Sequence, residues 1–374
     1  MQMTMKREIL LRALQRVQGV VERRNTMPIL SHVLIDAKGA GATVFATDLE
    51  IGLKGHYEAS VAEPGQLTVS ARKLYEIVRA VSAEEIKFTS TDPKSVRVEA
   101  GSSRFQVMTL SPGEFPSLPV GDGATEIGID GVAMGELIRK TVFAVGENDA
   151  RYVLNGTLLT TSTSGNKTVL RLVGTDGHRL AMAERPISAP KNKAAAELSA
   201  IIPKKALLEI RRLLDEQSSG TLTIGLSKSQ CTVQCDGLTL VARLMEGTYP
   251  NYQQVIPKGS VKPMLANRAA LESALQRVSL LAREKTNAIK WELGQGKLLL
   301  TASNPDQGEA HDELAVNYAG EKITTGFNAR YLIEALAVAD TEEVSIELKD
   351  GLSPCVIREK DGTDGLCVIM PMRI

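Results

Sequence analysis

The stretch ATVFATDLEIGLKGHY (42–57) decides the fold, because it recurs twice further along the chain. It consists of an apolar run, the pair Thr47-Asp48 and a second β-like run. The recurrences are TVLRLVGTDGHRLAMAE (168–184), with Thr175-Asp176, and KLLLTASNPDQGEAHDEL (297–314), with Ser303-Asn304. The spacing is 128 residues both from position 47 to 175 and from 175 to 303. Self-similarity at a fixed period indicates repeated structural units.

Other segments recur around this element in the same order. Helix-like segments precede it at 7–21, 135–148 and 268–282, and basic helix-like segments follow it at 69–81, 201–214 and 327–338. The period is much longer than the roughly 20–50 residues of solenoid repeats, so each copy has the size of a domain with its own core. We expect domains at 1–125, 126–258 and 259–374, with Pro- and Gly-rich linkers near 118–125 and 256–263.

Each copy reads as helix, strands, helix, strands. Its strand-like runs are separated by short turn signals such as Lys38-Gly39, Gly294-Gln295-Gly296 and Lys349-Asp350-Gly351. Strands joined by short turns pair antiparallel, which predicts an α+β fold with two helices per copy on antiparallel sheets.

Composition excludes several classes of protein. Lys and Arg number 44, as do Asp and Glu, so the chain is not basic overall as many nucleic-acid-binding proteins are. With 43% hydrophobic residues it can bury a large core, which excludes dominant disorder. No apolar run approaches the ~20 residues of a membrane helix, and charges at Lys6, Arg7 and Glu8 interrupt any signal-peptide core. Four cysteines do not make a disulfide framework, so we expect a cytoplasmic protein.

The charge is unevenly distributed. The six helix-like segments (5–20, 71–81, 134–145, 203–214, 268–279 and 328–338) hold sixteen Lys or Arg but six Asp or Glu. Lys and Arg commonly decorate solvated helices, but Glu is an equally good helix former, so that explanation predicts similar numbers of both signs. The excess indicates a basic surface that faces a polyanion. With 4% aromatic residues and no zinc-finger spacing, we expect phosphate contacts on DNA without base reading.

Motifs for catalysis or metal binding do not assemble. Cys231 and Cys235, four apart on a β segment, would lie about 13 Å from each other and could not share a metal. Asp176-Gly177-His178 lacks the G-x-S-x-G nucleophile elbow and fits a turn. Gly39-Ala40-Gly41 fits a hairpin because no GK[ST] follows, and Trp291 fits core packing. We therefore expect no enzyme, no cofactor and no metal.

Three α+β copies with basic helices, in a chain that ends VIMPMRI, resemble the bacterial β sliding clamp family, the processivity subunits of DNA polymerase III. The resemblance covers the whole chain. Its most specific segments are NTMPILSHVLI (25–35), GTDGHRLAM (174–182), GTYPNYQQVIP (247–257), FNARYLIEAL (327–336) and MPMRI (370–374).

The resemblance implies a ring made by a head-to-tail homodimer, with helices around duplex DNA. It also implies a clamp loader as a partner, and tethering of the polymerase III alpha subunit and of other polymerases or repair proteins. The DNA-proximal residues it implies are Arg24, Arg72, Lys73, Asn148, Tyr152, Lys204, Lys205 and Arg211. Asn148 stands where the best-known members carry Gln, and its shorter side chain reaches less far towards phosphate. The implied subunit contact pairs Phe105 and Val107, with Lys73 nearby, against Leu280 and Leu281.

The family's partner pocket takes short peptides that carry Gln and a pair of large apolar residues. Its implied residues here are Leu154, Thr175, Gly177, His178, Arg179, Leu180, Pro250, Val255, Asn328, Tyr331, Val368, Met370, Pro371, Met372 and Arg373. The methionines would form an adaptable apolar wall that several partners can share, although without the resemblance core packing explains them equally well. Gln254 replaces an Arg common in relatives, and Cys355 replaces a Ser, so partner affinities can differ. The alternative function is a peptide-binding scaffold, or an unrecognised hydrolase, of repeated α+β domains without DNA.

Overall fold

The computed structural model of the chain describes residues 1–21, 27–92, 94–117, 124–165, 167–188, 197–216, 220–257 and 262–373. They form two compact units, Met1–Val132 with Leu208–Leu244, and Ala133–Leu207 with Met245–Ile374. Residues of the expected second domain, 126–258, belong to both units. Within the described ranges, no helix is long and apolar enough to cross a membrane.

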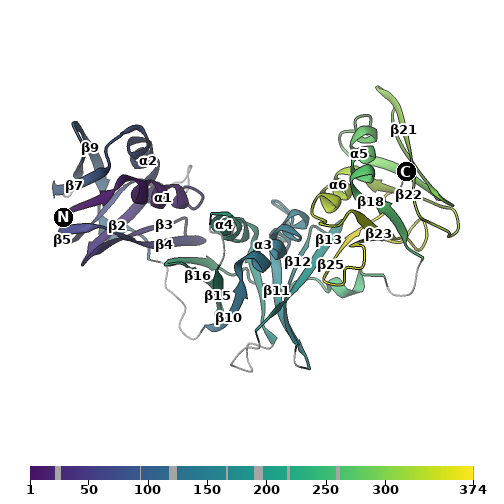
Figure 1. Cartoon of the computed structure of the whole chain (residues 1–374), viewed down its shortest axis with the longest axis horizontal. Coiled ribbons are helices and arrows are strands. Elements are labelled where there is room, and N and C mark those ends of the chain that lie inside the picture. Colours follow the sequence, from purple (N-terminus) through teal and green to yellow (C-terminus); the bar gives the residue numbers. More distant parts are fainter. Residues whose placement is uncertain are drawn as a thin grey trace. The chain divides into compact units, whose positions relative to one another are not determined.

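The first unit contains one antiparallel sheet of thirteen strands, in the order β10-β15-β16-β17-β4-β3-β2-β6-β9-β8-β7-β1-β5. Helices α1 (Arg7–Val17) and α2 (Ala71–Ala80) pack together, with α1 against β3 and β4 and α2 against β2 and β6 (Figure 1). The strands are β1 Gln2–Lys6, β2 His32–Lys38, β3 Gly41–Thr47, β4 Ile51–Glu58, β5 Ser60–Glu63, β6 Gly65–Ser70, β7 Glu85–Asp92, β8 Ser95–Ala100, β9 Ser103–Leu110, β10 Thr125–Asp130, β15 Thr221–Leu226, β16 Gln230–Cys235 and β17 Leu238–Arg243.

The second unit contains two antiparallel sheets, in the orders β14-β11-β12-β13-β25-β24-β23-β18 and β21-β20-β19-β22. Helices α5 (Arg268–Ser279) and α6 (Ala329–Ala337) pack together, and α3 (Gly131–Arg139) and α4 (Lys204–Asp215) have residues in both units. The strands are β11 Gly156–Ser164, β12 Lys167–Thr175, β13 Arg179–Ile187, β14 Ser199–Pro203, β18 Met264–Asn267, β19 Ala288–Gly294, β20 Lys297–Asn304, β21 Gly308–Ala315, β22 Ile323–Asn328, β23 Glu343–Glu347, β24 Cys355–Glu359 and β25 Gly365–Ile369.

The α+β prediction is confirmed, and the six predicted helices are present, with one difference. The segment predicted as a helix at 134–145 is α3, which ends at Arg139 and is followed by the 3-10 turn η3 (Val142–Ala144). Thr141 stops the α-helix, because its φ of −129° leaves the helical region and its hydroxyl donates to the carbonyl oxygen of Leu137 over 2.7 Å. Further 3-10 turns within the described ranges are η1 Pro28–Ser31, η2 Pro112–Glu114, η4 Tyr152–Asn155 and η6 Tyr252–Gln254.

The same backbone bonds recur in each copy and define which residues are equivalent. The backbone N–H that starts the first helix donates to a carbonyl oxygen that follows the second helix: Arg7 to Glu84 over 2.8 Å, Gly131 to Gly220 over 2.8 Å and Arg268 to Glu342 over 2.9 Å. The central hairpin closes on corresponding pairs, with Thr47 opposite Gly52, Thr175 opposite Leu180 and Ser303 opposite Glu309, and the third hairpin is one residue longer. We call residues 1–125, 126–258 and 259–374 the first, second and third repeat.

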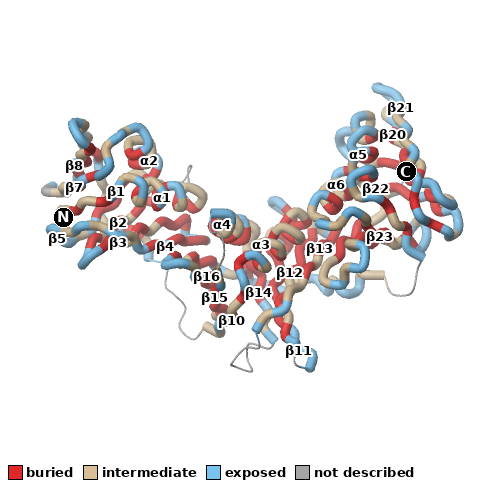
Figure 2. The backbone as a smooth tube through the Cα atoms, viewed as in Figure 1, coloured by how far each residue is buried: buried red, intermediate tan, exposed pale blue. Residues whose placement is uncertain are grey.

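Buried residues run along the strands beneath the helices (Figure 2). Leu10, Leu14 and Val17 form the buried stripe of α1. Trp291 on β19 is fully buried and meets Phe327 edge to face, with ring centroids 5.4 Å apart, which confirms its packing role. None of the four cysteines forms a disulfide.

Candidate functional site

The recurring Thr-Asp pair is a turn that its own side chains close. The Thr175 hydroxyl donates to the carbonyl oxygen of Arg179 over 2.6 Å and accepts from the Gly177 N–H over 3.1 Å. One Asp176 carboxylate oxygen accepts from the backbone N–H groups of His178, at 2.9 Å, and Arg179, at 3.0 Å. The first repeat makes the four equivalent bonds. Because both side chains close the turn, both recur in the sequence.

Gly177 lets a neighbouring arginine approach this turn. Its φ is +83°, and a β-carbon there would lie 2.6 Å from a guanidinium nitrogen of Arg151. Arg151 donates to the carbonyl oxygen of Asp176 over 2.9 Å and pairs with Asp149. Its hydrogen bonds lower the pKa of Asp149 to about 2. Arg151 thereby holds the 146–151 loop against the turn.

The last residues of the described chain lie beside the turn. Leu180 of β13 is opposite Val368 of β25, and both are buried in one apolar cluster that also contains the partly buried Val255. Beyond β25, the Met370 N–H donates to the carbonyl oxygen of His178 over 2.9 Å, and the Met372 N–H donates to that of Gly326 over 2.7 Å. Met370, Pro371 and Met372 are half-buried. They therefore border the surface, which does not fit plain core packing.

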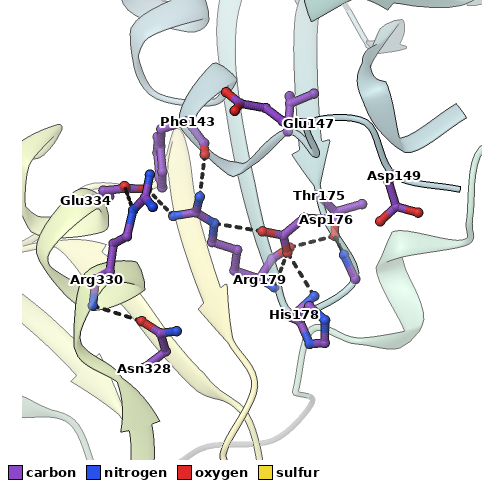
Figure 3. Close-up of polar contacts among 12 residues, drawn as sticks. Phe143, Glu147, Asp149, Thr175, Asp176, His178, Arg179, Asn328, Arg330 and Glu334 are labelled. Atoms are coloured by element: carbon purple, nitrogen blue, oxygen red, sulfur yellow. Dashed lines mark hydrogen bonds and ion pairs between the residues drawn. The ribbon is translucent and has the colours of Figure 1, made fainter. Parts of the chain in front are cut away.

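Arg179 connects the turn to helix α6 of the third repeat (Figure 3). Its side chain is 9% exposed. It donates to the carbonyl oxygen of Phe143 over 2.7 Å, to Asp176 over 3.1 Å and to Glu334. Its guanidinium also lies 4.4 Å from the centroid of the Tyr331 ring. All its partners orient one planar side chain, so Arg179 fixes the turn and the Tyr331 ring together.

A polar cavity of about 450 Å³ adjoins this group. Its walls include Lys204 and Arg330 together with Glu147, Asp149 and Glu334. The charges are paired: the Lys204 ammonium is 2.7 Å from Glu147, and Arg330 Nε donates to Glu334 over 2.6 Å. The cavity is thus polar, and the positive side chains in its walls are paired with carboxylates in the same walls. Within the described ranges, no group of three or more His, Cys, Asp or Glu is arranged to hold a metal ion.

All fifteen predicted pocket residues are described. The contacts above connect the turn residues 175–180, the segment 368–372, Val255 and Tyr331. Asn328 caps α6 by accepting from the Arg330 N–H over 3.0 Å, and Leu154 is 1% exposed. Pro250 and Arg373 are exposed.

The predicted DNA-proximal residues lie mostly at the starts of helices. Arg72 and Lys73 are in the first turn of α2, with side chains 81% and 61% exposed. Lys204 and Lys205 start α4, where Arg211 lies 4.0 Å from Asp215. The remaining described residues are Asn148, with φ +57°, and Tyr152, which is 61% exposed. Arg24 lies outside the described residues. With the observed helix bounds, fourteen Lys or Arg face seven Asp or Glu, so the basic excess persists.

The predicted subunit-contact residues belong to strand β9 and to the segment that follows α5. Phe105 and Val107 belong to β9, whose residues 103–108 pair with β8. Leu280 and Leu281 directly follow α5, and Leu280 is 78% exposed. Beside that helix, β21 is the end strand of its sheet and is mostly exposed (Figure 2).

Sequence reasoning missed two residues, Arg330 and Glu334. Arg330 has the same place in α6 that Arg72 has in α2 and Lys205 in α4, two positions after residues that face equivalent strands. The shared position was a readable signal. Glu334 binds both Arg179 and Arg330, but no sequence signal marks it, because its partner Arg179 is 155 residues away.

Family models of the DNA polymerase III beta subunit match the chain in three consecutive segments. The N-terminal domain model matches residues 1–119, the central domain model 129–251 and the C-terminal domain model 253–373. The beta sliding clamp of Pseudomonas putida is 38% identical, and that of Escherichia coli is 32% identical, each over 375 residues that cover 100% of both chains.

Solved structures agree. DNA polymerase III subunit beta from Pseudomonas aeruginosa has a TM-score of 0.94 at 38% identity, with 100% of both chains covered. The sliding clamp from Bartonella birtlesii bound to griselimycin has a TM-score of 0.94 at 35% identity, again with 100% of both chains covered.

Proposed function

Because the chain belongs to the DNA polymerase III beta subunit family, the bacterial sliding clamps, we propose that it acts as a head-to-tail dimeric ring around duplex DNA. The ring tethers replicative and repair polymerases through short peptides and needs no catalytic group of its own. A clamp loader opens it, and it works in the cytoplasm, in keeping with four cysteines that form no disulfide.

The observation that carries the proposal is a strand pairing between consecutive repeats. One chain forms this pairing twice, between the first and second repeats and between the second and third, and leaves the third and first repeats without it. Strand β4 of the first repeat pairs with β17 of the second, and β13 of the second pairs with β25 of the third. The equivalent strands are β21 of the third repeat, which ends its sheet, and β9 of the first, which pairs with β8 over residues 103–108 and with β6 only at residues 109 and 110. A second copy that joins β21 to β9 makes a heterologous contact, and such contacts form rings when the rotation closes.

Equivalent positions predict the register of this contact. Leu53 is opposite Leu240 in the first junction, and Ala181 is opposite Cys367 in the second. The corresponding residues are Ala310 on β21 and Phe105 on β9, so we expect Ala310 to face the partner's Phe105. Both side chains lie on the less exposed face of their strand. A slip of one residue would oppose apolar with exposed polar side chains, which disfavours other registers.

Leu280 fits the same scheme. Its equivalents are Gly19 and Phe143, twelve residues after the start of their helices. Gly19 lies against Glu209 of α4, and Phe143 packs on the core of the third repeat. In both junctions this position therefore contacts the following repeat. Leu280, 78% exposed in one chain, would contact the partner near α2, the helix that carries Lys73, with Leu281 next to it.

We assign DNA contact to Arg24, Arg72, Lys73, Asn148, Tyr152, Lys204, Lys205 and Arg211, and add Arg330. Support comes from Arg72, Lys205 and Arg330, which place a cation in the first turn of an equivalent helix in every repeat. Helix N-termini attract phosphate because their N–H groups are unsatisfied and the helix dipole is positive there. Enclosure makes a few weak contacts sufficient, and phosphate contacts carry no sequence information.

We assign peptide binding to the fifteen residues around the 175–180 turn and the 368–373 segment. Support comes from the half-buried methionines beside a turn that Arg179 and Arg151 hold rigidly. A rigid polar rim next to an adaptable thioether wall suits a site that admits several related peptides. The griselimycin complex of the Bartonella clamp agrees with a ligand-binding surface in this family.

Retention on DNA tests the ring. After loading, the protein should stay long on nicked circular DNA and leave linear DNA rapidly through the ends. Equal loss from both would refute encirclement and favour a peptide-binding scaffold without DNA.

A further inference from the structure

Each repeat places a cation nine residues after the start of its first helix: Arg16, Lys140 and Arg277. In the two junctions within the chain, this cation reaches the following repeat. Arg16 donates to Glu216 over 2.9 Å. Lys140 lies 2.7 Å from Glu359 and 3.2 Å from Asp340. Both cationic side chains are 11% exposed. The position thus holds a partly buried ion pair across each finished junction.

Arg277 behaves differently in the single chain. Its side chain is 61% exposed, and its guanidinium pairs within its own repeat with Asp312 on β21, at 2.7 Å. The residues equivalent to Asp312 are Gly55 and Ala183, three positions beyond the matched pairs of the central hairpin. Arg16 and Lys140 therefore face no carboxylate at that place. The internal partner is specific to the junction that one chain leaves open.

A matching acceptor exists on the other edge of the chain. Glu216 and Asp340 each follow closely after the second helix of their repeat, which ends at Asp215 in α4 and at Ala337 in α6. The corresponding segment after α2 contains Glu84 and Glu85, both exposed. By the bond that closes each repeat, Glu84 corresponds to Gly220 and Glu342, which follow Glu216 and Asp340 by four and two residues. The first repeat thus offers carboxylates in the segment that follows its second helix, a few residues beyond the position of the acceptors in the other two junctions.

We propose that Arg277 is a two-position latch between subunits. In a separated chain it pairs with Asp312, and in the dimer it turns to the partner's Glu84 and the partner's Glu85 and becomes buried. The inference rests on the proposed head-to-tail dimer. The register above sets the uncharged Ser103 of the partner subunit opposite Asp312, so the partner's strand does not replace the cation that Asp312 gives up.

The latch makes opening and closing an exchange of ion pairs. If Arg277 had no alternative partner, separating the subunits would leave its guanidinium unpaired, and this cost would oppose separation. With Asp312 available, opening leaves Arg277 paired. The two junctions within the chain, which never open, have no such alternative at Gly55 and Ala183. The device lowers the resistance to opening at the one junction that a loader must separate.

The test measures the monomer–dimer dissociation constant of full-length variants by sedimentation velocity. Arg277→Glu, and separately Glu84→Lys with Glu85→Lys, should each weaken the dimer about tenfold or more. The combination of all three should restore it to within about threefold of the wild type, since it re-forms the pair with reversed sign. Asp312→Asn should tighten the dimer by about threefold, because it removes the competing exposed pair.

Three outcomes overturn the latch. No rescue in the charge-reversed combination would mean that Arg277 does not face these carboxylates. A dimer weakened by Asp312→Asn would mean that Asp312 acts across the interface and not as the alternative partner. The variant Leu280→Asp distinguishes failure of the latch from failure of the proposed dimer. If the wild type dimerises, Leu280→Asp is monomeric and Arg277→Glu still dimerises normally, the latch fails while the proposed function stands.

Discussion

Arg179 on β13 and Glu334 on α6 form an ion pair that joins the second repeat to the third, although they are 155 residues apart in the chain. Glu334 also accepts from Arg330, and Arg179 also holds Asp176, Phe143 and the Tyr331 ring. The candidate DNA-contacting cation Arg330 and the turn of the candidate peptide pocket therefore share one carboxylate. Changes to this group should affect the pocket beyond a general loss of stability.

Arg179→Lys should weaken peptide binding about tenfold or more. Lysine keeps the charge but loses the planar fork, so it cannot hold Asp176, Phe143 and Glu334 together or stack on Tyr331. The free energy of unfolding should fall by about 2 kcal/mol. Binding is measured by the anisotropy of a labelled peptide with Gln and two large apolar residues. Unfolding in urea is followed by the fluorescence of Trp291, the one tryptophan of the chain.

Arg185→Lys is the matched control. Arg185 is 15% exposed and pairs with Glu136 and Asp364, away from the 175–180 turn. Its replacement should reduce stability to a similar extent and leave peptide affinity unchanged. Equal losses of affinity in both variants would show that Arg179 acts through stability alone.

Acid should destabilise the unit through Glu334. Burial raises the pKa of this carboxyl, but hydrogen bonds from Arg330 and Arg179 outweigh burial and hold the pKa below its ordinary 4.5. A depressed folded-state pKa contributes stability that is complete above the unfolded value and is lost as pH falls through the folded one. The free energy of unfolding should therefore decline below about pH 5. Urea titrations at several pH values should give a shallower decline for Glu334→Gln, and the same change at exposed Glu246 should not alter it.

Met370→Ala with Met372→Ala should abolish polymerase stimulation and leave the dimer intact. Each truncation removes apolar contact at a half-buried site, worth about 1–3 kcal/mol of binding. Leu352→Ala is the control, because Leu352 is 85% exposed in the same repeat and lies in another loop. Primer-extension length and peptide anisotropy are the measurements. Unchanged stimulation in the methionine variant would remove the pocket assignment.

Arg72→Gln, Lys205→Gln and Arg330→Gln should each weaken DNA binding to a similar degree on any sequence. Each should lower the slope of log K against log salt by about one, since one phosphate contact is lost. The measurement is binding to duplex DNA over a salt series. Lys297→Gln serves as the control, because Lys297 is 67% exposed and lies on β20, outside the helices. If the control loses as much affinity as the helix variants, diffuse charge explains the binding and the helix starts have no special role.

The repeat could be recognised from the sequence because Thr175 and Asp176 form hydrogen bonds within their own turn. Their side chains close the turn that they occupy, so the pair recurs wherever the turn does. The positions of the helices could likewise be predicted, because each helix depends on the pattern of residues within its own segment. The end of α3 was missed because Thr141 looks like any helical residue until its hydroxyl bonds back to Leu137.

Contacts between repeats were beyond the reach of such reasoning. Glu334 resembles the other helix glutamates, and its role depends on where β13 places Arg179. Arg277 likewise continues an ordinary basic helix in the sequence. Its distinctness follows from comparing its exposure and its Asp312 partner with those of Arg16 and Lys140. The family resemblance gave the candidate residues. The equivalence of positions between repeats then explains why those residues lie at the junctions and at the helix starts.

The turn also predicts where the chain can be stabilised. Its left-handed position is Gly177 in the second repeat and Leu49 in the first, with φ values of +83° and +78°. A β-carbon in this conformation costs about 1 kcal/mol or more, and Leu49 is 42% exposed, so its side chain returns little by burial. Leu49→Gly should therefore raise the stability of the first repeat by about 0.5–1 kcal/mol after the entropic penalty of glycine.

Hydrogen exchange of the β3 and β4 amides measures this change locally, because the turn joins these two strands. Leu49→Ala is the matched control: it removes the side chain but keeps the β-carbon, so it should not slow exchange. If Leu49→Gly speeds exchange as much as Leu49→Ala does, the leucine side chain makes a stabilising contact that outweighs its backbone strain.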